Sequence, residues 1–304
     1  MRMSEWIDPE LHQSFIAQQT DALRLCTSPD GWVERFGVDV LISHKTDAAL
    51  ERLKTELCLW ALNVDFQFRR VFARFLPKHN ADREAPTLIL GDPGTNLQST
   101  ALERTLHYAI DFGAGYSVGL FIDQRENRRF VRDLAPGTLL NCFAYTCSFS
   151  VAAATVGAKT VSVDLSKKSL SRGRENFALN SLPTTDHRFL ADDVMAVLPR
   201  LARRGEKFDA IILDPPTFSR SHRGKAFQVE QDFETLLLAA LEVAERNARI
   251  LLSTNCSVLG TRALEVMARF CMKATRRAGE LHREPALPDF PPGVGAATVW
   301  LTLR

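Results

Sequence analysis

Apolar and polar positions follow a regular pattern only after about residue 104. From there, short apolar runs alternate with longer stretches of helical spacing, which is typical of a parallel sheet with helices on both faces. The expected strands are 138–141, 160–163, 187–190, 210–213, 249–253 and 298–303. The expected helices are 150–156, 167–180, 194–203 and 230–247. This pattern predicts a Rossmann-like, doubly wound α/β domain.

The first hundred residues have a less regular pattern. Residues 1–30 have helix-like spacings, and residues 32–43 read as a strand or hairpin. Turn-forming and charged residues are frequent over 79–93. We therefore predict a smaller α/β domain over residues 1–103 and the larger domain over residues 104–304.

Composition sets limits on the class of protein. Apolar residues make up 45% and charged residues 24% of the chain, which suits a globular protein with a sizeable core. The formal charge is only +2, so contact with nucleic acid would need local basic patches. The start, MRMSEWIDPE, lacks the apolar core of a signal peptide, and no apolar run is long enough for a membrane span. We therefore expect a cytoplasmic protein without a membrane partner.

Cysteine and histidine are scattered along the chain. The six cysteines are Cys26, Cys58, Cys142, Cys147, Cys256 and Cys271. The sequence has neither a CxxC pair nor an HExxH motif. We therefore expect core residues or reactive thiols rather than disulfides, and we expect no metal.

Basic residues gather in two segments. Residues 64–78 mix basic and aromatic side chains, which suits stacking on RNA bases and contact with phosphates. The basic residues there are Arg69, Arg70, Arg74 and Lys78. A half-buried strand or helix with a solvated basic face explains the same pattern. Residues 218–225 are either a second RNA-contacting loop or a solvated connection, and they hold Arg220, His222, Arg223 and Lys225.

Polar side chains follow successive predicted strands of the larger domain. They are Asp164, then Asp192 and Asp193, then Asp214 with Pro215 and Pro216, and finally Thr254, Asn255 and Cys256. In a parallel sheet, these positions meet at the edge where ligands bind. Asp164 can accept both ribose hydroxyls of a nucleoside, and Asp193 beside Val194 can hold an adenine amino group next to an apolar face.

The order of these acids favours one nucleoside cofactor over another. A single aspartate after a strand is usually a helix cap, but four such positions in register favour a binding site. The turn over residues 143–149 contains no glycine, so its backbone cannot readily approach the pyrophosphate of a nicotinamide cofactor. A ribose acid, an adenine acid and an Asp-Pro-Pro turn instead predict a site for S-adenosylmethionine (SAM).

Five segments of the larger domain form a recognisable set. They are GLFIDQRENR (119–128), LNCFAYTCSFSVAAATVGA, SVDLSKKSL, DPPTFSRS and STNCSVL. Together they resemble the bacterial large-subunit ribosomal RNA methyltransferases, which include a cytosine-C5 enzyme and a guanine-N7 enzyme. The resemblance covers residues 105–304 well and residues 30–100 more loosely. It implies a class I methyltransferase with a mostly parallel seven-stranded sheet, SAM as cofactor, and RNA, namely 23S ribosomal RNA, as partner.

Two segments depart from the family pattern. The usual Tyr-Thr-Gly-Gly is here YTCS, from Tyr145 to Ser148, and the usual His-Lys-Thr-Gly is YSVG, from Tyr116 to Gly119. Both changes bear on cofactor affinity. The RNA-binding PUA domain that many members carry is not expected, because too few residues precede Trp32 to build one. RNA contact would then rest on the smaller domain and on residues 218–225.

The resemblance assigns a cofactor-binding role to residues at one sheet edge. They are Asp123, Gln124, Arg125, Asn141, Phe143, Tyr145, Thr146, Ser148, Asp164, Leu165, Asp192, Asp193, Val194, Asp214 and Pro215. Among them, Asp164 would bind ribose, Asp193 would bind adenine, and Asp214 would lie near the transferred methyl group. Arg125 has an alternative role in an ion pair with Glu126 or Asp123.

The base that is methylated depends on the role of Cys256. Cytosine C5 is a poor nucleophile, so an enzyme must first add a thiolate at C6, and the family's cytosine-C5 members have a cysteine at the place of Cys256. Asp214 would then hydrogen-bond or protonate the base. The DPPTFS segment instead looks nearer to the guanine-N7 members, which need no nucleophile. An inert core cysteine is the alternative for Cys256, and Cys147 is interpreted as a packing substitution.

These observations predict a SAM-dependent methyltransferase that modifies cytosine C5 of ribosomal RNA, with Cys256 and Asp214 as catalytic residues, in a monomer or homodimer. Guanine-N7 transfer is the alternative. A methyltransferase for a small molecule or a protein, and a non-catalytic RNA-binding paralogue, also stay open.

Overall fold

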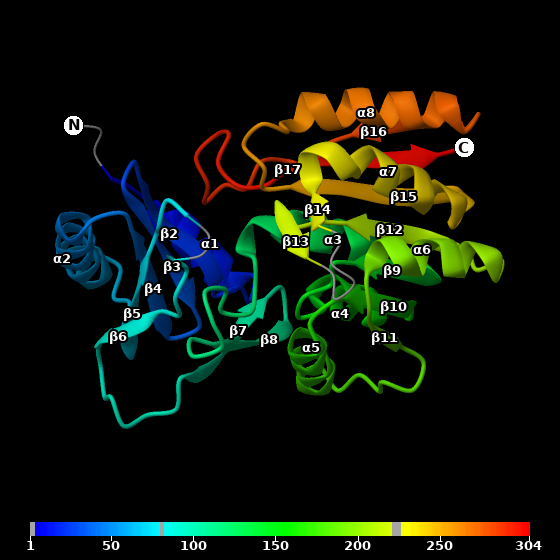
Figure 1. The fold of residues 1–304 in the computed structure, drawn as a ribbon. Coiled ribbons are helices and arrows are strands. Elements are labelled where there is room, and N and C mark those ends of the chain that lie inside the picture. Colours follow the sequence, from blue (N-terminus) through cyan, green and yellow to red (C-terminus); the bar gives the residue numbers. More distant parts are fainter. Residues whose placement is uncertain (1–3, 80–81, 221–225) are drawn as a thin grey trace. The chain divides into compact units, whose positions relative to one another are not determined.

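The computed structural model describes residues 4–79, 82–220 and 226–304. The chain forms two compact units (Figure 1). The first comprises Met1–Ile122 and Ala286–Val294, and the second comprises Asp123–Pro285 and Gly295–Arg304. Within the described residues, no helix is both long enough and apolar enough to cross a membrane.

A six-stranded sheet, in the order β1-β2-β3-β4-β5-β6, forms the first unit. Its strands are β1 (Glu5–Trp6), β2 (Ala22–Ser28), β3 (Gly31–Phe36), β4 (Asp39–His44), β5 (Arg70–Phe75) and β6 (Thr87–Leu90). Neighbours are antiparallel except β4 and β5, which are parallel. Parallel strands need a crossover connection, and helix α2 (Asp47–Asn63) supplies it.

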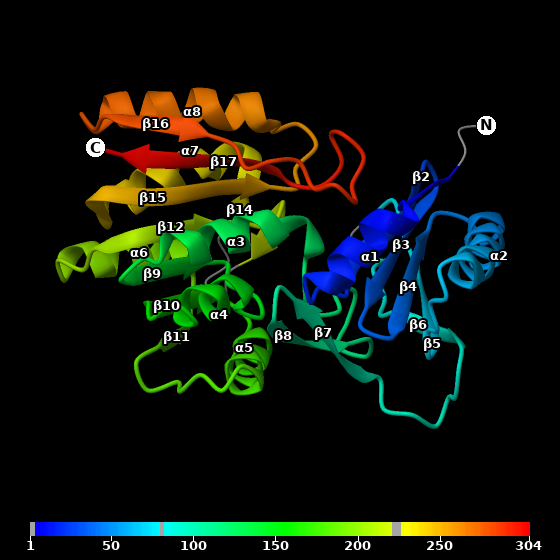
Figure 2. The ribbon, with the colours of Figure 1, turned by 180° about the vertical axis from the view of Figure 1, so that it is seen from behind.

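Figure 2 shows helices α1 (Pro9–Ala17) and α2 next to this sheet, and both contribute to the core of the first unit. Phe15 from α1 and Leu53 and Leu57 from α2 share one apolar cluster with Ile42 of β4. A strand or hairpin was expected over residues 32–43, and the structure shows a hairpin, because β3 and β4 are antiparallel partners.

The helix-like interpretation of residues 1–30 is wrong in the second half of this segment, where residues 22–28 form β2. Residues 22–26 are buried without interruption. A strand that is covered on both faces lacks the alternation of apolar and polar side chains that would have marked it.

A separate two-stranded hairpin follows the six-stranded sheet in the chain and belongs to the first unit. Its strands, β7 (Gln98–Glu103) and β8 (Leu106–Asp111), are antiparallel partners. The boundary predicted after residue 103 falls between these two strands, whereas the division between the compact units follows Ile122. The segment 286–294 also joins the first unit, where the Arg24 backbone N–H donates to Asp289 Oδ2 over 2.9 Å.

A seven-stranded sheet, in the order β11-β10-β9-β12-β15-β17-β16, forms the second unit. Its strands are β9 (Thr138–Cys142), β10 (Lys159–Asp164), β11 (Arg188–Ala191), β12 (Phe208–Leu213), β15 (Ala244–Thr254), β16 (Gly279–His282) and β17 (Ala297–Leu303). The neighbours from β11 to β15 are parallel, and β17 is antiparallel to both β15 and β16. The predicted Rossmann-like, mostly parallel sheet of seven strands is therefore confirmed.

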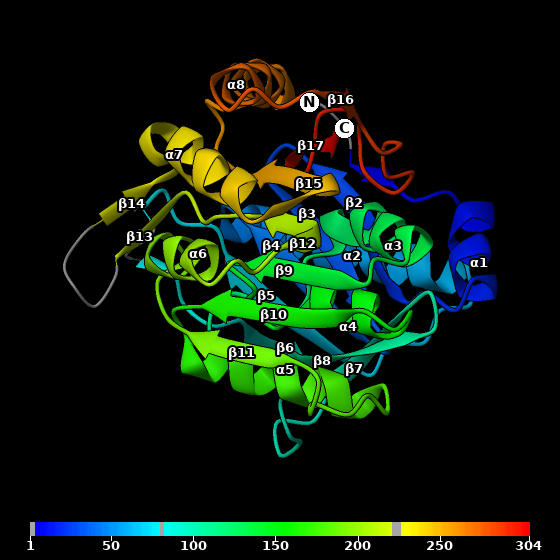
Figure 3. The ribbon, with the colours of Figure 1, turned by 90° about the vertical axis from the view of Figure 1, so that its right-hand side faces the viewer.

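Helices cover both faces of this sheet. They are α3 (Arg125–Leu134), α4 (Ser148–Ala154), α5 (Lys167–Leu179), α6 (Val194–Arg203), α7 (Val229–Glu242) and α8 (Thr261–Ala274), and the 3-10 turn η2 (Ile122–Gln124) precedes α3. Figure 3 shows α6 and α7 on one side of the strands and α3 and α4 on the other. The carboxyl ends of the central strands are thus left for the site.

One predicted helix of the second unit is too long. The helix expected over 230–247 ends at Glu242, and β15 begins at Ala244. Ala244 pairs with Phe208 of β12 and is only 2% exposed. Ala244, Glu245 and Arg246 are good helix formers by themselves, but pairing with the central strand prevails over that preference.

Candidate functional site

The predicted acids and the predicted nucleophile lie at one edge of the second sheet. Asp164 ends β10, Asp192 follows β11 and Asp214 follows β12. Cys256 comes two residues after the end of β15. These strands are parallel and lie in the order β11-β10-β9-β12-β15, so their carboxyl ends point in one direction.

The turn after β9 holds three residues in the left-handed region of φ. They are Phe143 (φ 58°), Tyr145 (φ 47°) and Cys147 (φ 61°). Residues with side chains seldom adopt this conformation, so neighbouring contacts must hold it. The Ala144 N–H donates to the Val163 carbonyl over 2.9 Å, and the Tyr145 N–H donates to Asp164 Oδ2 over 2.8 Å. Strand β10 therefore fixes the turn that replaces the family's glycine-containing segment.

Cys147 fits into this turn because its neighbour on α5 is a glycine. A Cβ atom added to Gly173 would lie 2.4 Å from Cys147 Sγ and 3.0 Å from Cys147 Cβ. Cys147 is fully buried, and burial raises the pKa of its thiol to about 12. A thiol with this pKa stays protonated near neutral pH, which agrees with the interpretation of Cys147 as a packing substitution.

Asp164 is held by two backbone groups. Its Oδ2 accepts from the Tyr145 N–H and its Oδ1 accepts from the Ser166 N–H, each over 2.8 Å. Burial raises the pKa of this carboxyl, whereas the two hydrogen bonds lower it. Each oxygen keeps a second lone pair, so the carboxylate can still accept the two hydroxyls of a ribose.

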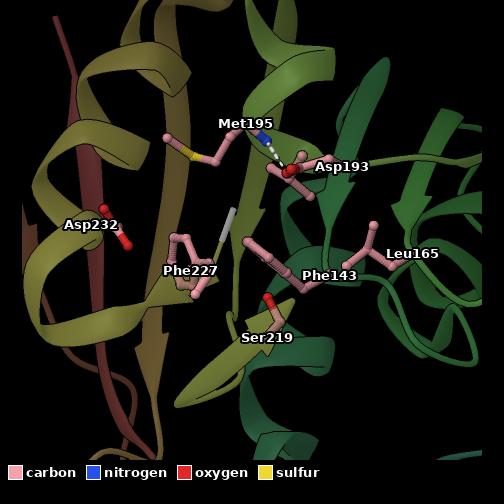
Figure 4. Close-up of a pocket in the computed structure, with 9 residues that line it drawn as sticks. Phe143, Leu165, Asp193, Met195, Ser219, Phe227 and Asp232 are labelled. Atoms are coloured by element: carbon pink, nitrogen blue, oxygen red, sulfur yellow. Dashed lines mark hydrogen bonds between the residues drawn. The ribbon is translucent and has the colours of Figure 1, made fainter. Parts of the chain in front are cut away.

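A pocket opens beside Asp193 at the start of α6 (Figure 4). It is lined by Phe143, Leu165, Asp193, Val194, Met195, Ser219, Ala226, Phe227 and Asp232. Apolar walls with a few carboxyl and hydroxyl groups suit a flat heterocycle that carries an amino group. The chemistry of the lining therefore fits the adenine of a nucleoside.

Four predicted cofactor residues meet in this pocket, namely Phe143, Leu165, Asp193 and Val194. Asp193 also caps α6, because its Oδ1 accepts from the Met195 N–H over 2.9 Å. Asp193 can therefore cap α6 and also line the pocket, because its second carboxylate oxygen takes no part in the capping bond. Asp192 lies apart, in an ion pair with Arg200.

The sequence did not predict the wall of the pocket opposite β10. Phe227 lies on β14 (Ala226–Gln228), which forms a hairpin with β13 (Phe218–Arg220), and its ring centroid is 5.5 Å from that of Phe143. Residues 218–220 are thus a strand where a loop was predicted. His222, Arg223 and Lys225 lie outside the described residues, as does the Arg220 side chain. The DPPTFS motif was the available signal, because it leads directly into this hairpin.

Asp214 is connected to the turn before α3. It is hydrogen-bonded to Ser253, and Ser253 Oγ also accepts from Gln124 Nε2 over 2.8 Å. Burial raises the pKa of Asp214 to about 6, against the lowering effect of the Ser253 hydrogen bond. Among nearby charges, Asp123 raises this pKa and Arg128 lowers it. Asp214 can therefore carry or release a proton near neutral pH.

Several other predicted cofactor residues are buried within the unit. Gln124, Arg125, Asn141 and Thr146 are at most 2% exposed. Asn141 donates to Ser150 Oγ over 3.0 Å, and the Thr146 carbonyl accepts from Asn176 over 2.8 Å. Arg125 Nε lies 3.9 Å from Glu126 Oε1, which is the alternative ion pair. The remaining residues, Asp123, Ser148 and Pro215, lie in η2, at the start of α4 and directly after Asp214. The cofactor roles of these residues stay predictions.

Cys256 has a carboxylate as its partner. Its thiol, whose residue is 7% exposed, donates to Glu230 Oε1 over 3.3 Å. Its backbone N–H donates to Thr254 Oγ1 over 3.0 Å. All six cysteines are free thiols, and only Cys58 is exposed.

The basic segment of the first unit is mostly structural. Arg70 is 1% exposed and pairs with the fully buried Asp39 over 2.7 Å. The Arg74 side chain is 10% exposed and contacts Ser43, Glu34 and the Tyr116 carbonyl. RNA contact through Arg70 or Arg74 is therefore contradicted, whereas the Arg69 side chain is 52% exposed.

A family model described as S-adenosylmethionine-dependent methyltransferase matches residues 31–302. The chain belongs to this family. The match extends over most of both units, and it makes SAM the cofactor of this methyltransferase, as predicted.

Relatives of this methyltransferase confirm the resemblance found in its motifs. Ribosomal RNA large subunit methyltransferase I of Aeromonas hydrophila is 34% identical over 282 residues, which are 89% of this chain and 70% of the relative. Ribosomal RNA large subunit methyltransferase K/L of a Psychrobacter species is 40% identical over 154 residues, 49% of this chain and 19% of the relative. The chain spans about half the length of other curated relatives that it matches.

A solved structure supports the fold and the cofactor class. The crystal structure of SMU.776 in complex with SAH superposes on this methyltransferase with a TM-score of 0.81 at 26% identity. The superposition covers 97% of this chain and 78% of that protein.

Proposed function

We propose that this methyltransferase modifies C5 of a cytosine in large-subunit ribosomal RNA, with Cys256 as the nucleophile. The observation that carries the proposal is the position of a thiol and a carboxyl group at the ends of adjacent strands. Leu213 of β12 pairs with Leu252 of β15, so Asp214 and Cys256 follow paired strands at one edge. The relatives named as ribosomal RNA large subunit methyltransferases support the choice of RNA.

The cofactor would lie along the edge from β10 to β12. Asp164 would hold the ribose, and Asp193 with Phe143 and Leu165 would hold the adenine. SAM bound there supplies an electrophilic methyl group. This arrangement would leave Asp214 and Cys256 for the base that accepts the methyl group.

Each protein side chain has a distinct task in this reaction. The Cys256 sulfur, as its thiolate, would add to C6, which moves the C5–C6 π electrons onto C5 and makes that carbon nucleophilic. Asp214 in its acid form would donate its proton to N3 as the adduct forms. After C5 has been methylated, the Asp214 carboxylate would take the C5 proton, the C5–C6 double bond would re-form, and the sulfur would leave. The N3 proton is then released to solvent.

One observation favours a second candidate, guanine-N7 transfer. Cys256 belongs to the main apolar cluster of the second unit, as an inert core cysteine would. The DPPTFS segment resembles the guanine-N7 members, and N7 already carries a lone pair that needs positioning but no nucleophile.

The substitution Cys256→Ala separates the two candidates. We expect it to abolish methyl transfer to ribosomal RNA and to leave SAM affinity within about twofold in calorimetry, because the thiol acts on the base and not on the cofactor. RNA that contains 5-fluorocytidine should form a complex with the wild type that survives denaturant, because fluorine blocks the final elimination. Nucleoside mass spectrometry of the product identifies the base.

Cys271→Ala is the matched control, because Cys271 is a buried thiol of the same apolar cluster on α8. It should keep methyl transfer and the covalent complex. If Cys256→Ala methylates RNA at the normal rate and the product is 7-methylguanosine, the cytosine mechanism is wrong and the second candidate replaces it.

A further inference from the structure

The first turn of α7 brings two acids to the edge that carries the site. Asp232 lines the pocket beside Phe227. Glu230 is exposed, and its Oε1 accepts the hydrogen bond of the Cys256 thiol over 3.3 Å. One helical turn therefore connects the wall of the pocket with the proposed nucleophile.

Cys256 differs in its partner from two other buried thiols. Cys147 donates to the Tyr145 carbonyl over 3.8 Å, and Cys271 donates to the Glu234 carbonyl over 3.9 Å. A peptide carbonyl is too weak a base to take a thiol proton near neutral pH, whereas a carboxylate can. The Cys256 thiol is therefore the one of these three that donates to a group able to remove its proton.

Glu230 places its carboxylate within hydrogen-bond reach of the Cys256 thiol. It lies in the first turn of α7, where a helix dipole favours acidic side chains. The nucleophilic form of cysteine is the thiolate, so the proton must leave as sulfur attacks. Because Cys256 is only 7% exposed, few water molecules can take that proton at neutral pH, where hydroxide is scarce.

We propose that Glu230 is the general base that takes the Cys256 proton when the sulfur adds to the base of the RNA. The proposal rests on the function proposed above. In this step the S–H bond breaks and its proton moves to Glu230 Oε1, while the S–C6 bond forms and the C5–C6 π electrons move onto C5. When the S–C6 bond later breaks, the same proton returns to sulfur. Glu230 therefore ends each turnover as a carboxylate.

The test compares Glu230→Gln with the wild type under single-turnover conditions, with 5-fluorocytidine-containing ribosomal RNA as the probe. At pH 7 we expect covalent-complex formation to be roughly 10²- to 10⁴-fold slower, the usual contribution of a general base. The loss should shrink as pH rises, because hydroxide then removes the thiol proton. Glu230→Asp should recover part of the rate. SAM affinity should not change.

Glu234→Gln is the matched control, since Glu234 is an exposed acid on the same helix whose carbonyl, not its side chain, accepts from Cys271. It should react as the wild type does. A wild-type rate for Glu230→Gln, or a loss that is equal at every pH, would overturn the role of Glu230. If Cys256→Ala is inactive in the same assay, the proposed function survives that result. If Cys256→Ala is active, both proposals fail.

Discussion

Asp214 is the residue whose chemistry depends most directly on its surroundings. Its pKa of about 6 reflects burial first, and then the hydrogen bond from Ser253 and the opposing charges of Asp123 and Arg128. An ordinary aspartate would have lost its proton two pH units lower. At neutral pH, a fraction of the molecules therefore keeps the acid form that the proposed donation to N3 requires.

The rate of methyl transfer should consequently fall as pH rises through about 6, since the acid form is lost there. Asp123→Asn removes a negative neighbour and should move this fall to lower pH. Asp214→Asn should abolish the fall and lower the rate at every pH. Single-turnover rates measured between roughly pH 5 and 8 test the expectations for the wild type and for both variants, because a carboxyl with this pKa titrates in that range. An upward shift in Asp123→Asn would contradict the assignment.

At the residue scale, the sequence predicted the pocket residues that directly follow parallel strands. It did not predict the pocket residue that comes from a hairpin. Phe143, Leu165, Asp193 and Val194 share a pocket because parallel strands bring their carboxyl ends together. Phe227 reaches the same pocket through the hairpin β13–β14, whose approach depends on tertiary packing. No local spacing in the sequence contains that information.

At the element scale, the contact between the turn after β9 and helix α5 should affect both stability and SAM affinity. Gly173→Ala would place a Cβ 2.4 Å from Cys147 Sγ, so either the turn or α5 must shift. We expect a loss of about 1–3 kcal/mol in the free energy of unfolding, which is typical of overpacking. SAM affinity should fall as well, because the same turn donates to Asp164. Denaturant unfolding and calorimetry measure the two effects.

The double variant Cys147→Gly/Gly173→Ala is the control for that substitution. It removes the thiol that the new methyl group meets, and glycine tolerates the φ of 61° at position 147. Both stability and SAM affinity should recover to a large extent. If Gly173→Ala alone behaves as the wild type does, the thiol is not packed against α5.

The buried strands of the second unit were predicted to within a few residues. Helix α3 and strand β16 were missed. Helix α3 reads RENRRFVRDL, and its many charges resemble a solvated connection although Val131 is fully buried. Strand β16 lies at the edge of the sheet and is only partly buried. In both cases the apolar signal is small, because the buried residues of α3 are mostly polar and β16 has no fully buried residue.

At the scale of the whole molecule, the stability of the first unit depends on a buried charge pair. Burial opposes ionisation of Asp39, but hydrogen bonds from Arg70 and Arg69 keep its pKa below the usual value. Arg70→Ala would leave a buried carboxylate with the half-exposed Arg69 as its one arginine partner, beside the hydrogen bond with Ser99, and should cost about 3–5 kcal/mol in the free energy of unfolding. Arg69→Ala, at a side chain that is 52% exposed, should cost less than about 1 kcal/mol.

Equilibrium unfolding in urea compares the two variants. If both variants lose the same free energy of unfolding, the ion pair between Arg70 and Asp39 is not the dominant one. A loss of RNA binding in Arg70→Ala would report unfolding of the first unit, whereas the same loss in Arg69→Ala would report a lost phosphate contact. If Arg69→Ala loses a phosphate contact, the slope of log affinity for RNA against log salt concentration should fall by roughly 0.7 to 0.9.

The division into units also shows what a local pattern cannot predict. Residues 286–294 return to the first unit from the far end of the chain, where Asp289 accepts from Arg24 and the Phe290 ring lies 4.2 Å from the Arg24 guanidinium. Contacts between residues some 265 positions apart leave no trace in periodicity.

The packing of Cys147 against Gly173 makes substitutions at these two positions interdependent. A Cβ atom at position 173 would lie 2.4 Å from the Cys147 thiol, so cysteine at position 147 fits best beside glycine. With glycine at position 147, no thiol would occupy the space between the turn and α5, and alanine at position 173 should be tolerated. The effect of a change at one position therefore depends on the residue at the other, so a redesign of this turn has to treat the two positions as a pair.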